Sequence, residues 1–382
     1  MHLNKWLVFV VCLMVTACSL VQKSATEMKA PVFVASSWNA LPDWEQVSLA
    51  LSLEALRSEC ANLKMKPAWQ QICAEAGLLD VDNNEGLHQF FENRFTPYQL
   101  RNGDGSEQGL ITGYYEPLLY GSRKKTKRFR YPVFGVPDDL LIVDLSKLYP
   151  QLKGMRLRGR MKGRKIIPYY DRADIDGKHA PKGKAILWVD DQIGLFFLQV
   201  QGSGRVQLPD GSIVRLGYAD QNGYPYASIG KKLVEMGELT LAQASLQSIR
   251  QWGMDHPKRL SELLNTNRSY VFFRQMPNST QSAVGAMGIP LTAGYSMAVD
   301  RRTIPLGMPV FLSTTWPNTD KPLNRLMLAQ DTGGAIKGVI RGDFFWGFGD
   351  EAGKQAGSMK QKGRMWVLFP KGMNPDIKKK AR

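Results

Sequence analysis

The sequence predicts a mainly β fold with a helical N-terminal region. Apolar positions between residues 43 and 95 recur at helical spacings, and no glycine interrupts this segment before Gly77. From Gly109 onward, short β-branched or aromatic runs are separated by Gly, Pro and Asp, which is typical of strands and tight turns. The chain has 382 residues, 43% of them hydrophobic, which is enough to bury a core and indicates about two domains. A disordered chain is therefore excluded.

The first residues have the pattern of an export signal. Lys5 precedes a short apolar run over 6–15, and the run ends in the small residues before Cys18. That run is too short to span a bilayer as a mature helix but suits a cleaved signal. Cys18 resembles the acceptor of bacterial lipidation, so we expect 1–17 to be a lipoprotein signal peptide. An ordinary signal peptide cleaved nearby is the alternative.

The residues after Cys18 indicate where the exported chain goes. Ser19 stands where an Asp would favour retention in the inner membrane, so we expect lipid attachment at the periplasmic face of the outer membrane. The segment 18–40 is mostly polar and is expected to be a tether between the lipid and the folded body.

The remaining cysteines suggest one disulfide. Cys12 is lost with the signal, which leaves Cys60 and Cys73 on either side of 64–67, an expected break between two helices. An oxidising periplasm permits a bond between them, and two free buried thiols are the alternative. No His or Cys has metal-ligand spacing, and the chain has only four His, so we expect no metal and no cofactor.

The central and C-terminal parts predict several elements. The run 193–201 is nearly all apolar, as in a strand buried on both faces. Short strands joined by Gly-rich connections toward the C-terminus are typical of a small barrel. Expected strands lie in 109–119, 185–208, 271–274, 291–298, 309–312, 326–329 and 365–369, and expected helices in 228–236 and 241–252.

The net charge of +16 indicates an anionic partner, and the cations concentrate in 123–172, above all at 123–125 and 156–165. A solvated face is one interpretation of this segment. A surface that touches anionic lipid headgroups or the carboxylates of wall peptides is the other. Nucleic acid is disfavoured because an exported lipoprotein rarely meets it.

Asp300, Asp331 and Asp343 are the candidate catalytic groups. Each adjoins apolar residues, glycines beside Asp331 and Asp343 permit sharp turns, and the aromatic run 344–346 offers flat faces for sugar rings. Carboxyls gathered in one place repel one another, so one of them retains a proton near neutral pH, as a general acid needs. Turn and strand-end capping roles are the alternative.

The three aspartate segments together resemble the barrel domain of the membrane-bound lytic murein transglycosylase A family. The resemblance runs from about Leu87 to Pro370, whereas the helical region before it and the basic loop 123–165 match less clearly. Four upstream segments agree with the same family: Thr112-Gly113-Tyr114-Tyr115-Glu116-Pro117, Leu198-Gln199-Val200-Gln201-Gly202-Ser203-Gly204, Gly217-Tyr218-Ala219-Asp220-Gln221-Asn222-Gly223 and Tyr226-Ala227-Ser228-Ile229-Gly230.

The resemblance implies a double-psi β-barrel assembled from both ends of the chain, with an inserted second β-domain and a groove between them. It divides the chain into a helical region joining the barrel (41–114), the insert (115–272) and the barrel domain with the aspartates (273–382). It also implies that Asp343 is the catalytic acid and base, with Asp331 its companion and Asp300 a supporting third. The residues implied to line the groove are Tyr115, Gln201, Gly202, Ser203 and Tyr218.

The implied function is that of a peptidoglycan lytic exotransglycosylase. Protonated Asp343 would protonate the glycosidic oxygen between N-acetylmuramic acid and N-acetylglucosamine, then take the proton of the muramic C6 hydroxyl as a 1,6-anhydro sugar forms. Asp331 could instead activate water in a hydrolase, and a noncatalytic wall-binding lipoprotein is a further alternative. Carboxylates holding a divalent cation are chemically feasible. Expected partners are peptidoglycan glycan strands, outer-membrane lipid and a cell-wall synthesis or remodelling complex.

Overall fold

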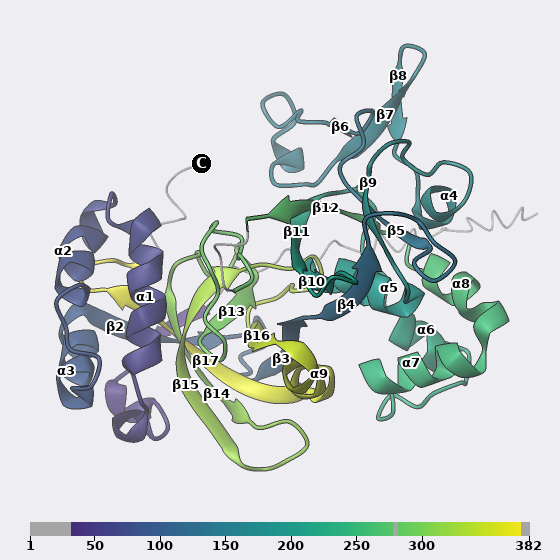
Figure 1. Cartoon of the computed structure of the whole chain (residues 1–382). Helices are drawn as coiled ribbons and strands as arrows, with labels where there is room; N and C mark the ends of the chain where they lie inside the picture. The colour runs from purple at the N-terminus through teal and green to yellow at the C-terminus, as the bar shows by residue number, and fades with distance from the viewer. Residues whose placement is uncertain (1–31, 278–281, 376–382) are drawn as a thin grey trace, which may run out of the picture.

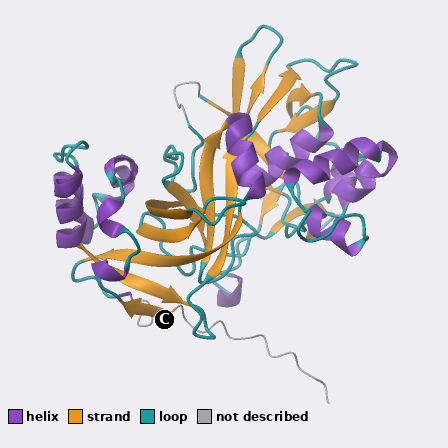
Figure 2. Cartoon of the chain, turned by 90° about the horizontal axis from the view of Figure 1, so that it is seen from below, coloured by secondary structure: helices purple, strands orange, loops and turns teal. Residues whose placement is uncertain are grey.

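The structure, a computed structural model, describes residues 32–277 and 282–375. Two large β-sheets occupy the middle of the molecule, and helices gather at its two ends (Figures 1 and 2). One end holds α1 (Ala50–Leu63), α2 (Pro67–Ala76) and α3 (Asn84–Arg94). The expected mainly β fold with a helical N-terminal region is confirmed. The expected signal peptide and Cys18 lie outside the described residues.

The N-terminal helices pack on the first sheet. Leu53 and Leu56 of α1 are fully buried in one core cluster with strand residues such as Phe311. Pro67 begins α2, where its missing N–H costs no hydrogen bond, so the expected break between two helices is found. Cys60 and Cys73 form a disulfide that joins α1 to α2, with 5.6 Å between their Cα atoms.

The first sheet closes into a barrel. Its strand order is β1-β2-β17-β14-β15-β13-β16-β3, and an additional pairing of β17 with β3 closes the last six strands into a ring. This closed barrel agrees with the expected double-psi barrel. Three strands of the first sheet, β1, β2 and β3, precede the second sheet in the chain, so both ends of the sequence build the first sheet. The bounds are β1 Val32–Ala35, β2 Phe95–Arg101, β3 Gly109–Glu116, β13 Ser296–Val299, β14 Pro309–Thr315, β15 Pro322–Asp331, β16 Arg341–Phe348 and β17 Lys360–Pro370.

The expected tether over 18–40 is wrong for its last part. Val32–Ala35 pairs with β2 in antiparallel register, and the Phe33 ring meets the Phe369 ring edge-on at 5.3 Å. A 3₁₀ turn at Trp38–Ala40 follows, and the Trp38 ring packs at 4.7 Å from that of Trp44. The stretch folds onto the barrel although its composition is mostly polar. Burying the Phe33 and Trp38 rings contributes more folding free energy than is lost by ordering a few exposed polar residues.

The second sheet follows the barrel strand β3 after a single residue, Pro117. Its order is β12-β11-β10-β4-β9-β5, and a separate three-stranded sheet has the order β6-β7-β8. The bounds are β4 Leu118–Ser122, β5 Tyr131–Phe134, β6 Leu141–Ile142, β7 Arg158–Lys162, β8 Lys165–Pro168, β9 Ala185–Val189, β10 Ser203–Gln207, β11 Ile213–Gln221 and β12 Val271–Met276. The helices are α4 Arg172–Asp176, α5 Gln192–Gln201, α6 Ile229–Glu235, α7 Leu246–Asp255, α8 Pro257–Asn265 and α9 Gly349–Ser358. Short 3₁₀ turns also occur at Trp44–Gln46 and Pro150–Leu152.

The strand expected over 193–201 is wrong, because this segment is the helix α5. Its apolar side chains face two different cores: Leu195 and Leu198 pack with the second sheet, and Phe196 packs with α6, α7 and α8. A helix held between two cores is apolar on most sides, and periodicity alone does not distinguish it from a buried strand. Gly202 ends the helix with φ of +79°, a left-handed conformation that glycine adopts without strain.

Candidate active site

Asp331 and Asp343 lie on the two strands that flank β13. Ala298 of β13 is the register partner of Asp331 in the parallel pair with β15 and of Asp343 in the antiparallel pair with β16. A bulge in the first pairing, between Met297 and Ala298, brings Asp331 to this position. The barrel therefore gathers two of the three predicted aspartates around one small residue.

Two residues of β3 hold these carboxyls. Thr112 is the register partner of Asp343, and its hydroxyl donates a hydrogen bond to Oδ1 of Asp343. The hydroxyl of buried Tyr114 donates to Oδ2 of Asp331 at 3.1 Å. Sequence reasoning did not single out these two residues. The available signal was the two-residue alternation of the strand, which places Thr112 and Tyr114 on one face.

Backbone amides complete the surroundings of Asp331. The N–H of Ala286 donates to its Oδ1 at 3.1 Å, and the N–H of Thr332 donates to the same oxygen at 2.8 Å. Asp331 thus accepts three hydrogen bonds. Asp343, by contrast, accepts one, and its Oδ2 takes none from the described residues. The two carboxyls therefore differ in how strongly the protein stabilises their ionised forms.

Both carboxyls are partly exposed, and they adjoin a small apolar cluster through Ala298, their common register partner, and through Tyr114, which binds Asp331. Burial raises the pKa of Asp343 to about 6, although the Thr112 hydrogen bond and the Arg341 charge oppose the rise. Burial also raises the pKa of Asp331 to about 6, against its three donors, and the charge of Asp343 adds to the rise. A carboxyl with a pKa near 6 can both give and accept a proton near neutral pH.

Asp300 has different surroundings. Its side chain is only 4% exposed and accepts two hydrogen bonds from the Arg302 guanidinium, at 2.9 and 2.6 Å. Burial alone would raise its pKa, but Arg302 and the amide of Gly338 outweigh burial and lower it. The bond from the Gly338 N–H, at 3.0 Å, fixes the connection between β15 and β16. Asp300 thus positions the loop between the other two aspartates. Its carboxylate binds Arg302 and Gly338, and among the described residues it makes no hydrogen bond with Asp331 or Asp343.

The predicted groove residues contact one another from β3 to β11, and we call them the row from Tyr115 to Tyr218; the Tyr115 side chain itself packs against Gly353 of α9, on the face of β3 opposite Tyr114. The N–H of Tyr115, the neighbour of Tyr114 in β3, donates to Oε1 of Gln201 at 3.1 Å. Gly202 follows, and a Cβ at its position would lie 3.9 Å from that of Tyr218. Ser203 begins β10 opposite Gly217, the residue before Tyr218. The Tyr218 side chain, 37% exposed, presents an aromatic ring at the end of this row.

A buried carboxylate joins the two sheets. Glu116, the last residue of β3, is 1% exposed and accepts hydrogen bonds from Arg205 of β10 at 2.8 Å and from Arg215 of β11 at 3.4 Å. The Arg205 guanidinium also lies 3.8 Å from the centre of the Phe348 ring at the end of β16. This cluster, which sequence reasoning missed, fixes the aspartate strands relative to the row from Tyr115 to Tyr218.

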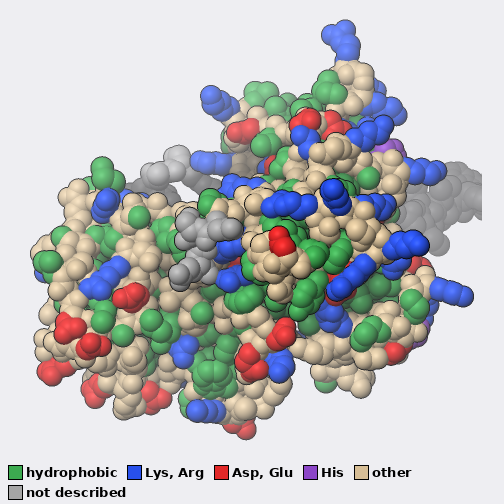
Figure 3. All heavy atoms as spheres, in the orientation of Figure 1, with side chains coloured by type: hydrophobic (Ala, Val, Ile, Leu, Met, Phe, Trp, Pro, Cys, Tyr) green, Lys and Arg blue, Asp and Glu red, His purple; other side chains and the backbone are tan. Residues whose placement is uncertain are grey.

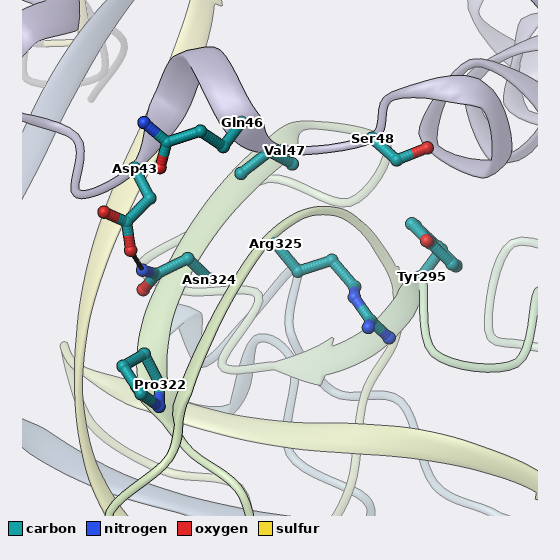
Figure 4. Close-up of a pocket in the computed structure, with 8 residues that line it drawn as sticks. All are labelled: Asp43, Gln46, Val47, Ser48, Tyr295, Pro322, Asn324 and Arg325. Carbon is teal, nitrogen blue, oxygen red and sulfur yellow. Dashed lines mark hydrogen bonds between the residues drawn. The ribbon is translucent and has the colours of Figure 1, made fainter.

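A separate cavity of about 300 Å³ contains none of the predicted site residues (Figure 4). Arg325 lies at one side with its guanidinium 4.7 Å from the centre of the Tyr295 ring. On the other side Asn324 donates to the Asp43 carboxylate at 2.7 Å, the dashed line in Figure 4. The cavity adjoins β15 but belongs to a different part of the surface from the paired aspartates.

Within residues 32–277 and 282–375, no group of three or more His, Cys, Asp or Glu side chains has the arrangement of a metal site. In the same ranges, no helix has both the length and the apolar character needed to cross a lipid bilayer.

Two family models match successive parts of the chain. The model described as the MltA specific insert domain matches residues 110–274, and that of the 3D domain matches residues 295–369. The matches coincide with the second sheet and with the barrel strands that carry the aspartates. The barrel, its insert and the paired carboxyls define a glycan-cleaving enzyme of the lytic transglycosylase class.

The similarity extends to whole proteins. The membrane-bound lytic murein transglycosylase A of Escherichia coli K12 is 33% identical over 278 residues, covering 71% of this chain and 68% of the relative. The chain belongs to the membrane-bound lytic murein transglycosylase A family.

Solved structures agree with this assignment. A crystal structure of MltA from Neisseria gonorrhoeae is 41% identical, with a TM-score of 0.77, over 90% of this chain and 94% of that one. A structure of Escherichia coli MltA with bound chitohexaose is 26% identical, with a TM-score of 0.67, over 90% and 95% of the two chains. The barrel with an inserted domain is thus the fold of this family.

Proposed function

We propose that this transglycosylase cleaves the β-1,4 bond between N-acetylmuramic acid and N-acetylglucosamine, with Asp343 as the acid and then the base. The observation that carries the proposal is the pairing of Asp331 and Asp343 around Ala298, where burial raises the pKa of each carboxyl to about 6. Family membership supplies the reaction class. The assignment of residues to steps rests on the hydrogen bonds around the two carboxyls.

Asp343 suits the proton transfer better than Asp331. Three donors surround Asp331 and favour its ionised form, whereas Asp343 has one donor and an oxygen that the described residues leave open. The two carboxylates repel each other, so the pair retains one proton near pH 6, and the difference in donors favours that proton on Asp343. Asp343 therefore holds the proton of the pair, and Asp331 remains the anion.

The reaction proceeds in two steps without consuming water. Asp343 first donates its proton to the glycosidic oxygen, the bond from that oxygen to the muramic C1 breaks, and an oxocarbenium-like species forms. Ionised Asp331 stabilises the positive charge at C1. The Asp343 carboxylate then removes the proton from the C6 hydroxyl as its oxygen bonds to C1. The product is a 1,6-anhydromuramic end, and Asp343 has regained its proton.

The row from Tyr115 to Tyr218 is the proposed glycan-binding surface. The Escherichia coli relative binds chitohexaose, so the family accommodates a chain of six sugars. The Tyr218 ring can stack on a sugar face, while Gln201 and Ser203 offer polar groups to hydroxyls and acetamides. Glu116 and its two arginines hold this surface in register with Asp343. β3 links the two parts, because it carries both Tyr115 and the Thr112 and Tyr114 hydroxyls that hold the carboxyl pair.

Membrane attachment through Cys18 completes the proposal. The relatives are named membrane-bound, and a lipid on Cys18 accounts for attachment at the outer membrane. Labelled fatty acid should be incorporated into the wild-type chain and not into Cys18→Ala. Contact with a wall-synthesis or remodelling complex stays a prediction, which crosslinking in cells tests.

Product mass distinguishes the proposed reaction from hydrolysis. Purified sacculi digested by the wild-type protein should release muropeptides that are lighter by one water than hydrolytic products. Hydrated products would mean that Asp331 activates water and that the chain is a hydrolase. A chain that binds sacculi and releases no muropeptide would be the noncatalytic binder.

A further inference from the structure

The small sheet β6-β7-β8 and the connection between its first two strands, residues 140–168, form what we call the basic arm. It stands apart from the two large sheets at the top of the molecule in Figure 1. Its strands pair only with one another, and side chains such as Arg158, which pairs with Asp220, connect the base of the arm to the second sheet.

The basic arm carries a concentrated positive charge. Residues 145–168 contain eight Lys or Arg and no Asp or Glu. Three of these cations contact other side chains: Arg158 pairs with Asp220 at 2.9 Å, and the guanidinium groups of Arg160 and Arg156 lie 4.0 and 5.9 Å from the centres of the Tyr170 and Tyr218 rings. Six of the eight are exposed, Arg156 among them, and no carboxylate of the described residues pairs with these six: Lys147, Lys153, Arg156, Lys162, Arg164 and Lys165.

Large apolar side chains are exposed between these cations. Met161 and Ile166, which face each other across β7 and β8, are 54% and 55% exposed. They lie directly beside the turn that carries Lys162, Arg164 and Lys165. Leu148 is 71% exposed in the connection before β7. Further exposed apolar residues of the arm are Ile142, Leu145, Tyr149 and Met155. Figure 3 shows hydrophobic and basic side chains interspersed over this part of the surface.

Exposed cations and exposed apolar side chains occur together on the arm, and this combination indicates the kind of partner that it binds. Carboxylates of wall peptides would satisfy the cations, but a polar glycan offers little to aliphatic groups such as Leu148, Met161 and Ile166. At the boundary between headgroups and acyl chains, aliphatic side chains enter the apolar layer while Lys and Arg meet phosphates. The arm, residues 140–168, has eight cations against one carboxylate, Asp144, so attraction to an anionic headgroup far exceeds repulsion.

We propose that the basic arm docks on an anionic phospholipid surface, independently of any lipid on Cys18. The arm would be a second contact with the membrane, and two contacts bind far more firmly than one. Arg156 at the base of the arm lies 5.9 Å from the Tyr218 ring, so docking would also set the orientation of the proposed glycan-binding row relative to the membrane. The proposal does not depend on the reaction assigned to Asp343.

Vesicle binding tests the proposal. The chain from Ser19 onward keeps every described residue and lacks Cys18, so it reports on the arm alone. It should cosediment with vesicles of equal parts phosphatidylglycerol and phosphatidylcholine, and only weakly with phosphatidylcholine alone. High salt should weaken the binding. Two arm variants should partition onto the anionic vesicles at least about tenfold less than wild type. One variant combines Met161→Ser with Ile166→Ser. The other combines Lys162→Gln, Arg164→Gln and Lys165→Gln.

Matched variants elsewhere control for composition. Met65 and Leu78 are 79% and 88% exposed in the helical region, and both changed to Ser should leave partitioning within about twofold of wild type. The charge control is Lys258→Gln with Lys321→Gln and Lys371→Gln, three exposed lysines outside the arm. Both arm variants should cleave soluble glycan strands at the wild-type rate, so failure of the docking proposal is separate from failure of the proposed reaction.

Three results would overturn the proposal. One is equal binding to the anionic and the uncharged vesicles. Another is vesicle binding by the arm variants that matches wild type. The third is loss of binding to purified sacculi in the arm variants while their vesicle binding persists, which would assign the arm to the wall polymer.

Discussion

Tyr114 in β3 donates its phenolic hydroxyl to Oδ2 of Asp331 at the end of β15, at 3.1 Å. This bond joins a strand that precedes the inserted sheet to one that follows it, so the carboxyl pair depends on both ends of the chain. It also stabilises the ionised form of Asp331, which is the form that the proposed reaction requires.

Changing Tyr114 to Phe should therefore raise the pKa of Asp331 and lower kcat about tenfold, with a smaller change in KM. The acidic limb of the pH profile of kcat should move to higher pH. Tyr169→Phe is a suitable control, since Tyr169 is also buried and donates its hydroxyl to a different aspartate, Asp139, at 2.8 Å. An unchanged acidic limb in Tyr114→Phe would show that this hydroxyl does not tune Asp331.

The pH dependence of activity should be bell-shaped with a maximum near pH 6. Above pH 6 Asp343 loses the proton it must donate, because its pKa is about 6. On the acidic side Asp331 gains a proton and no longer stabilises the positive charge at C1. The two carboxyls titrate as a coupled pair, so the limbs report apparent values of the pair. A rate that stays constant from pH 5 to pH 8 would contradict the assignment.

The raised pKa of Asp343 also predicts how stability changes with pH. A carboxyl whose pKa is higher in the folded state stabilises the fold while it is protonated, and this contribution is lost as the pH rises through about 6. Asp343→Asn removes the charge, so at pH 8 the variant should be more stable than wild type by on the order of 1 kcal/mol, allowing for partial solvent exposure. The difference should vanish near pH 4. Urea unfolding at both pH values measures it, and a variant less stable at pH 8 would be the contrary result.

Glu116 should matter for stability and for the alignment of the two sheets. Glu116→Gln leaves the Arg205 and Arg215 charges without their shared buried carboxylate, which typically costs about 3 kcal/mol of unfolding free energy. Glu75→Gln is the matched control, because its pair with Arg94 is one third exposed and should contribute less than about 1 kcal/mol. Equal losses of unfolding free energy in the two variants would show that Glu116 contributes no more to stability than a partly exposed surface ion pair.

Local sequence patterns predicted much of the fold because they follow from short-range physics. The helices before Phe95, the proline break at Pro67 and the barrel strands β3, β13, β14, β15 and β17 were anticipated in this way, whereas β2 and β16 were not. The helix α5 was mistaken for a strand because its neighbours on both sides are apolar, a property of the tertiary structure. The strand β1 was missed because it forms only when β2, some sixty residues later, is alongside.

The site was predictable in composition but not in detail. The resemblance identified three aspartates, and the structure pairs two of them while Asp300 binds Arg302. Which aspartates meet depends on the register of β13 with two neighbours, including one bulge, and no local pattern specifies that register. The same holds for Thr112 and Glu116, whose partners lie far away in sequence.

The most direct test of the central claim compares turnover and binding in Asp343→Asn. The amide keeps the size of the side chain but cannot exchange a proton, so release of anhydromuropeptides from sacculi should fall by about a thousandfold or more while binding to sacculi stays within about twofold of wild type. Release at a rate near that of the wild type would contradict the account, because the proton would then come from another group.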